Sequence, residues 1–339
     1  CLMIRTCAFA IWTSLIFASA AHLSAETSIT VSMDRTWNDG ETVFEIGSKQ
    51  PDITGIAGGS RITYPRDFAY TRMALGFYSG KVGIDLDVGA TGHAVRSGTG
   101  RDEDFFLYST SRVDGAKVSL QDGRFSDRTR VFSGGRNWAD SSGKTALVEY
   151  RARLITNYFP WSDASPFHRD SGTFFALGFE HIYSKYRIYD SIQYNVVSVT
   201  PTNPYPFNLT PIGSGLSFTN VSGELMLGAG VALYPWEAVG FSFSLSPLVG
   251  YANSRDYHSL RGITFIMENA GSGFLYQMET MIFPADRFLV RLGVTGHRFY
   301  ASGTVKAHGL DLLYNVLPPQ QMFLNTKEWG AKISLEYLL

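Results

Sequence analysis

Cysteine is almost absent from this chain of 339 residues, and its two cysteines, Cys1 and Cys7, both lie at the extreme N-terminus. The rest of the chain can therefore form no disulfide, and it offers no thiolate nucleophile or cysteine-based metal site. An excess of one charge is lacking as well, since 29 basic and 30 acidic residues give a formal net charge of -1. No strong electrostatic field favours nucleic acid, so we expect no partner of that kind.

A long apolar run is also missing beyond the N-terminus. There, Arg5 precedes a mostly apolar segment, Ala8 to Phe17, which small residues follow. This order is typical of a secretory signal peptide. The alternative, an uncleaved anchor, is disfavoured because the apolar segment is shorter than the ~20 residues of a spanning helix. We therefore expect residues 1–25 to be a leader and residues 26–339 to form a single exported domain.

Strict two-residue alternation of apolar with small or polar residues is what the chain has instead. In Val239 to Ser246, valine, phenylalanine and leucine alternate with glycine and serine. That is the pattern of a β-strand with one apolar and one polar face. The same alternation occurs at 82–92, 288–294 and 329–339, so the chain is predicted to be all-β.

The connections between these segments distinguish a membrane barrel from a soluble sandwich, which would also alternate. Three short turns, at 159–161, 234–236 and 283–284, combine aromatic residues with proline. Aromatic rings settle at the headgroup level of a bilayer. The intervening connections are longer and polar. We therefore expect the aromatic turns at a periplasmic rim and the long loops outside the cell.

Pairing each short turn with a long loop divides the chain into about ten strands, an even number that can close into a barrel. Closure is needed because every backbone polar group in hydrocarbon must be paired. The predicted fold is a transmembrane antiparallel up-and-down β-barrel, monomeric and surrounded by outer-membrane lipid. The expected strands are 28–47, 60–77, 81–97, 144–158, 173–197, 216–234, 238–252, 263–283, 287–304 and 327–339. The expected outer loops are 98–143, 198–215, 253–262 and 301–326.

Two aspartates, with Glu103 between them, follow the glycine-rich exit of the third predicted strand. Asp102 and Asp104 are two positions apart, so extended backbone sends both carboxylates to one side. Carboxylates so placed can share a proton or hold a water molecule; a solvated or cation-binding loop is the alternative. A second such pair, Asp85 and Asp87, lies within a strand and is expected to belong to the polar filling of the lumen.

A second polar motif, after the seventh predicted strand, places Asp256 two residues before His258. Counting in twos from Ser246 puts both on the lumen face, provided that no bulge intervenes. An aspartate beside an imidazole can orient it as a general base; ordinary polar loop residues are the alternative. Two further histidines, His93 and His297, are predicted to face inward and to join a polar network.

The order of elements and these two motifs resemble the omptins, outer-membrane proteases with a ten-stranded barrel and an active site at its extracellular end. The resemblance runs over nearly the whole predicted mature chain. It implies that Asp102 and Asp104 are an aspartate pair, and that Asp256 and His258 are an Asp-His dyad. These four residues would activate a water molecule to attack a peptide bond. The resemblance also implies lipopolysaccharide as a bound lipid, with no other cofactor and no metal.

Two departures from the omptins concern the substrate. Ser254 stands where members that cleave at basic residues carry an acid, and a neutral hydroxyl cannot pair with arginine as a carboxylate does. Glu41 and Glu45 lie near the place of a second acidic pocket residue. The loop up to residue 143 is also longer than is usual in the family, and could reshape the groove.

Two other functions fit the same scaffold. One is a non-catalytic barrel, either a small porin or an adhesin. The other is a hydrolase of membrane lipid esters, although the sequence contains no G-x-S-x-G elbow. It also contains no H-E-x-x-H motif.

Overall fold

The structure is a computed structural model that describes residues 27–47, 57–107, 113–117, 130–132, 138–196, 207–213, 215–259, 262–309 and 320–339. The expected leader, residues 1–25, lies outside these ranges, and so does much of the four expected outer loops. In the described ranges, no helix is long and apolar enough to cross a membrane.

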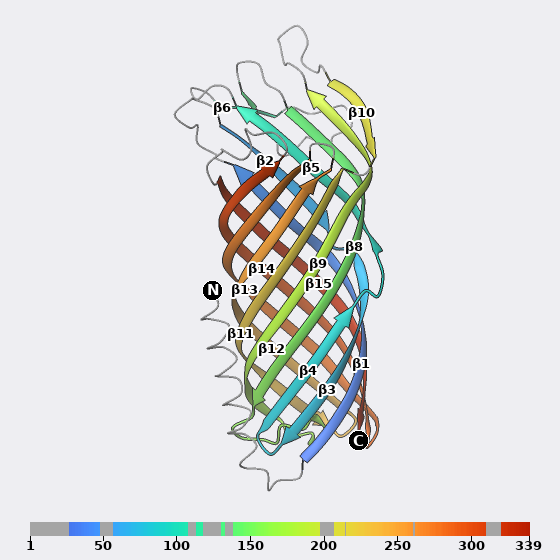
Figure 1. The fold of residues 1–339 in the computed structure, drawn as a ribbon. Helices are drawn as coiled ribbons and strands as arrows, with labels where there is room; N and C mark the ends of the chain where they lie inside the picture. The colour runs from blue at the N-terminus through green and yellow to red at the C-terminus, as the bar shows by residue number, and fades with distance from the viewer. Residues whose placement is uncertain are drawn as a thin grey trace.

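Antiparallel strands form one closed barrel (Figure 1). Eight strands run most of its height (β1, β8, β9 and β11 to β15), and two more complete the ring at either end: β3 and β4 at one, β2 and β5 at the other. Ten strands therefore meet at each level, as the sequence predicts. The elements are β1 (Thr27–Gly47), β2 (Ala57–Pro65), β3 (Phe68–Ser79), β4 (Val82–Ala90), β5 (Val95–Leu107), β6 (Val113–Lys117), β7 (Arg130–Phe132), β8 (Trp138–Tyr158), β9 (Gly172–Val196), β10 (Phe207–Gly213), β11 (Leu216–Trp236), β12 (Val239–His258), β13 (Ile263–Ala285), β14 (Phe288–Gly309), β15 (Gln320–Leu338) and a short 3-10 helix, η1 (Pro166–His168).

The outer wall of the barrel is apolar. Along β12, Phe243, Leu245 and Val249 are 45%, 48% and 56% exposed, whereas Ser246 on the opposite face is 7% exposed. Closely similar outward rows occur on β1, β3, β4 and β13 to β15. This arrangement is the reverse of a soluble sandwich, which buries its apolar face, and it suits a wall in contact with hydrocarbon.

We expect Leu245→Arg to lower the free energy of unfolding by about 2–4 kcal/mol, because it would hold a charge against the bilayer midplane. Leu245 lies six residues beyond the start of β12, about halfway along the 9–11 residues that cross the hydrocarbon. Urea unfolding in lipid vesicles measures the effect. The matched control is Asn253→Arg, an exposed position nearer the loops, which should cost less than about 1 kcal/mol. Equal losses in both variants would contradict a lipid-facing Leu245.

The short connections lie together at one end of the barrel, hereafter the short-turn end (Figure 1). Trp161 and Trp236 are 75% and 64% exposed there, as expected of rim residues. Phe283 is different: it lies at this end, two residues before the end of β13, but its ring is buried with Met281 and Leu289, so its expected exposure at the headgroup level is wrong. The reason is its position, since Phe283 has the inward parity of β13.

At the opposite end, hereafter the mouth, the strands continue further than predicted. β5 ends at Leu107, β12 at His258 and β14 at Gly309, so the expected outer loops that begin at 98, 253 and 301 begin too early. The cause is that the two faces of a strand no longer differ in polarity beyond the membrane. There the outward face no longer meets lipid and becomes polar, while the backbone ladder goes on.

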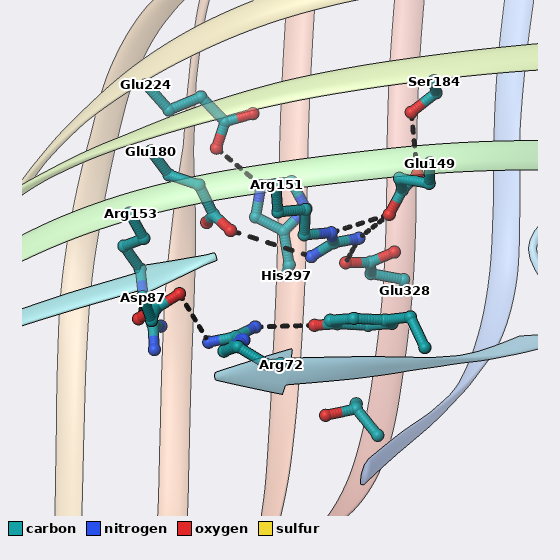
Figure 2. A network of polar contacts seen from close by, with 12 residues as sticks. Arg72, Asp87, Glu149, Arg151, Arg153, Glu180, Ser184, Glu224, His297 and Glu328 are labelled. Carbon is teal, nitrogen blue, oxygen red and sulfur yellow. Dashed lines mark hydrogen bonds and ion pairs between the residues drawn. The ribbon is translucent and has the colours of Figure 1, made fainter. Parts of the chain in front are cut away.

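Paired charges cross the middle of the lumen (Figure 2). Glu328 accepts from Arg66 and from Arg151, each at 2.7 Å, and Glu149 contacts the same two guanidinium groups at 2.7 and 2.6 Å. All four side chains are at most 6% exposed. Each buried charge thus has at least two opposite partners, and Arg151 has a third in Glu180 at 4.0 Å, which offsets part of the cost of desolvation. These four residues are the central ion network.

An aromatic layer lies between this network and the mouth. Tyr64 packs on Phe218 and on Tyr186, with ring centroids 4.9 Å apart in both pairs. Phe44 stacks on Phe218 at 5.9 Å. Each of these four rings is at most 1% exposed. The lumen is therefore crossed by two filled layers, one charged and one apolar.

The other residues expected in the lumen divide into confirmed and wrong predictions. Asp87 bonds to Arg153 at 2.7 Å, and Asp85 accepts from Tyr78 at 2.7 Å, so this pair does belong to the polar filling. His297 is buried against a glutamate, also as expected. His93 is exposed between β4 and β5, so its predicted inward place is wrong. The strand is interrupted there, so the two-residue alternation no longer predicts which face a residue occupies.

Candidate functional site

A buried Asp-His pair lies at the mouth, on the last residues of β12. The Nε2 atom of His258 lies 2.7 Å from Oδ2 of Asp256. Asp256 is fully buried and His258 is 8% exposed. β12 pairs with β13 without a register shift, and its buried positions stay even-numbered to the end. The predicted lumen-facing position of both residues is therefore confirmed, and the two side chains are in contact.

Two aromatic residues hold the pair in place. The hydroxyl of Tyr64 donates to Oδ1 of Asp256 at 3.4 Å, so both carboxylate oxygens have a donor. The ring of Phe265 meets the His258 ring edge-on at 5.2 Å. Because Nε2 faces Asp256, the neutral imidazole carries its hydrogen there, and Nδ1 is the nitrogen that can accept a proton.

Tyr64 lies beyond the lipid-facing part of the wall, since its β1 partner, Thr42, is five residues nearer the mouth than the outward-facing Trp37. Burial raises the pKa of Tyr64 well above its usual value, and the carboxylates of Asp256 and Asp102 raise it further. The phenol therefore stays protonated and donates at physiological pH.

Asp102 lies within β5 and not in a loop. It is 8% exposed, and its Oδ1 accepts from the hydroxyl of Ser60 on β2 at 3.1 Å. Its backbone pairs opposite Ile62. Asp104, two residues further along β5, pairs opposite Ser60, and its side chain lies outside the described part of the chain.

Asp102 and His258 both lie on the mouth side of the contact between Tyr64 and Asp256. The contact of Tyr64 with Asp256 joins β2 to β12 across the barrel. Asp102 pairs with the residue two positions nearer the mouth than Tyr64, and His258 is two positions nearer the mouth than Asp256. The two walls thus present a carboxylate and an imidazole just above the same contact.

The three residues considered for substrate recognition differ in charge and pairing. Ser254, directly below Asp256 on β12, is buried and donates to Asn220 at 2.8 Å. Glu45 forms an ion pair with Arg61 at 3.4 Å. Glu41 is half-buried and stands opposite Pro65 in the ladder. Position 254, beside the dyad, therefore offers a neutral hydroxyl and no carboxylate to bind a basic side chain.

Sequence reasoning missed Tyr64 and Ser60. Both lie on alternate positions of a segment that was predicted to be a strand, so their inward direction could have been read from parity. Their partners could not, because Asp256 is 192 residues from Tyr64 along the chain. Across the part of the chain that the structure describes, no group of three or more histidine, cysteine or acidic residues could hold a metal ion.

A closed barrel with an apolar outer wall and a polar lumen defines an outer-membrane β-barrel. Residues 49–333 match the family model described as "Putative porin". The match spans most of the chain, and the protein belongs to that family. Its place is accordingly the outer membrane.

Among solved structures, the chain is similar to the outer membrane protease OmpT from Escherichia coli, with 10% identity and a TM-score of 0.70 over 92% of this chain and 97% of that one. It also matches the P. putida toluene transporter TodX, with 8% identity and a TM-score of 0.28 over 93% and 90% of the two chains. No curated protein matches the sequence. The likeness to OmpT shows the fold alone, and the family match favours the non-catalytic alternative over the endopeptidase.

Proposed function

We propose that this barrel is a surface endopeptidase whose mouth activates a water molecule between Asp102 and Asp104 on one wall and the Asp256–His258 pair on the other. The observation that carries the proposal is the 2.7 Å contact of His258 with a fully buried Asp256 at the mouth. A buried carboxylate is costly unless hydrogen-bonding or charged partners offset its desolvation, and here the partner is the imidazole of His258. An imidazole held by such a carboxylate is suited to take up a proton.

In this mechanism Nδ1 of His258 takes a proton from the water molecule as its oxygen attacks the peptide carbonyl. Asp256 stabilises the imidazolium that forms. The carboxylates of Asp102 and Asp104 accept hydrogen bonds from the same water molecule and orient it. The imidazolium then gives its proton to the leaving amine, so that each proton is accounted for and the histidine returns to its neutral form.

The substrate is a peptide or protein, and the residue bound beside the dyad is not basic, because Ser254 is neutral and bonds to Asn220. The barrel would work as a monomer, with lipopolysaccharide as a bound lipid on its outer wall.

A second candidate is a porin, which the family match favours. Passage of a solute would have to cross both the central ion network and the aromatic layer. A polar cavity of about 200 Å³ does lie in the lumen on the short-turn side of that network, walled by Asp87, Arg153, Ser242 and Glu336 among others. The porin reading therefore requires the filled layers to move.

One pair of measurements separates the candidates. The full-length protein is inserted into vesicles containing lipopolysaccharide, given an unbiased peptide library, and assayed in parallel for conductance in planar bilayers. We expect internal cleavage of peptides by the wild type, its loss in Asp102→Ala, and no steady conductance. Stepwise conductance without cleavage would replace the endopeptidase by the porin. Release of fatty acid from the vesicle lipid, unchanged in Asp102→Ala, would replace it by a lipid hydrolase.

A further inference from the structure

We infer that Tyr64 is a positioning residue of this site: its hydroxyl fixes the Asp256 carboxylate and, through it, the ring of His258. The inference rests on the proposed function and adds a residue that neither the motifs nor the family resemblance contains.

The first observation is that the two oxygens of the Asp256 carboxylate have different partners. One oxygen, Oδ2, contacts His258 at 2.7 Å, and the other, Oδ1, receives the Tyr64 hydroxyl at 3.4 Å. A carboxylate with a donor on each oxygen cannot rotate without losing one of them. The 3.4 Å separation is long, and contacts of this kind tighten when substrate is bound.

The second observation is the setting of the Tyr64 hydroxyl. Phe44, Ile62 and Phe218 fill the same layer without any polar group, and all three are fully buried. The other phenol of the layer, Tyr186, directs its hydroxyl away from the dyad, toward Arg66 of the central ion network. A hydroxyl buried in such a layer is unfavourable without a partner, and the partner of Tyr64 is Asp256.

The third observation is that Tyr64 spans the two walls of the site. Its strand, β2, pairs with β5, which carries Asp102, while its hydroxyl and its ring reach β12 and β11 through Asp256 and Phe218. The ring is stacked on Phe218 with planes only 13° apart. Tyr64 is thus placed to set both the rotation of Asp256 and the spacing of the two walls.

The test is Tyr64→Phe, which keeps the ring and its stacking and removes only the hydroxyl. We expect kcat for peptide cleavage to fall about tenfold, the effect of one hydrogen bond to a charged group, with KM nearly unchanged. Without the Tyr64 donor, the Asp256 carboxylate interacts more strongly with the charged form of His258. The acidic limb of the kcat–pH profile should therefore move to higher pH.

The second readout does not depend on activity. Nitrogen-15 NMR of labelled histidine rings, with the His258 signal assigned through His258→Gln, should show the same upward shift of its titration in Tyr64→Phe. The matched control is Tyr70→Phe, a buried phenol that bonds to Arg72 and not to the dyad, and it should leave the His258 titration where it is.

Unchanged kcat and unchanged titration in Tyr64→Phe would overturn the inference, as would a shift of equal size in the control. If the wild type cleaves no peptide, the proposed function fails. The NMR titration then still decides whether Tyr64 holds the dyad. If Tyr64→Phe does not fold, the wild type and Asp256→Ala, which removes the acceptor, are compared for the tyrosine hydroxyl proton: its loss of hydrogen bonding in Asp256→Ala supports the contact, and its persistence contradicts it.

Discussion

His258→Ala is expected to lower kcat/KM for the best peptide substrate by about 10²–10⁴-fold, the range that a positioned acid–base group contributes. The variant removes the only group on the described walls that the proposal uses to move protons. Asp256→Ala should cause a loss of similar order, because the imidazole then loses its orientation and the partner of its charged form. The double variant should be hardly worse than either single one, since the two residues act as a unit.

Two other histidines make this prediction specific. His297 forms a pair with Glu224 at the same 2.7 Å, but lower in the lumen, at the level of Glu328. His93 is exposed. His93→Ala should leave kcat/KM unchanged, and His297→Ala should change stability more than it changes catalysis. A His258→Ala protein that is folded, as shown by a change in its migration on gels between unheated and heated samples, and still cleaves at the wild-type rate would end the role assigned to the dyad.

The fold was largely predictable because the physics of the wall is local. In each strand that crosses the lipid, side chains must alternate between hydrocarbon and lumen. The residues 239–246 therefore suffice to predict both the strand and its outward face. The same reasoning fails beyond the membrane, where β5 and β12 continue as paired strands without that contrast. It also fails at Phe283, because an aromatic residue beside proline can belong to the rim or to the interior, and only its parity along β13 decides.

Part of the site was predictable for the same reason. Counting from Ser246 to Asp256 and His258 works because β12 has no bulge over that stretch. Counting fails at His93, where residues 91–94 interrupt the strand and Gly92 adopts a positive φ of 77°. The contact with Tyr64 has no local signal at all. It arises from closure of the barrel, which places β2 and β12 on facing walls of the lumen, and neither segment alone predicts it.

The lumen gives a reason for a site at the mouth and not deeper. A peptide entering from the mouth meets the aromatic layer that lies just below Asp256, with Tyr64 and Phe218 fully buried in it. A reaction centre below this layer would be sealed from large substrates. The dyad lies at its upper surface, where His258 keeps 8% of its area exposed. The same layer is what a solute would have to displace if the barrel worked as a pore.

Glu328→Ala is expected to lower the free energy of unfolding by about 3–5 kcal/mol, the usual cost of removing one partner from a buried ion pair. Glu328 lies between Arg66 and Arg151 at 2.7 Å from each, and its side chain is 5% exposed. Its loss leaves two buried guanidinium groups sharing the carboxylate of Glu149, with the 4.0 Å contact of Arg151 to Glu180 beside it. Urea unfolding in vesicles, followed by tryptophan fluorescence, measures the change.

The control is an ion pair with a similar distance and a different environment. Lys144 and Asp190 are 2.8 Å apart, but their side chains are 49% and 62% exposed, so Lys144→Ala should cost less than about 1 kcal/mol. The comparison bears on function. If the ion network contributes several kcal/mol to the free energy of unfolding, its opening to let a solute pass would be costly. If Glu328→Ala loses as little unfolding free energy as Lys144→Ala and also conducts ions, the central ion network is held weakly enough to open. That result would favour the porin over the endopeptidase.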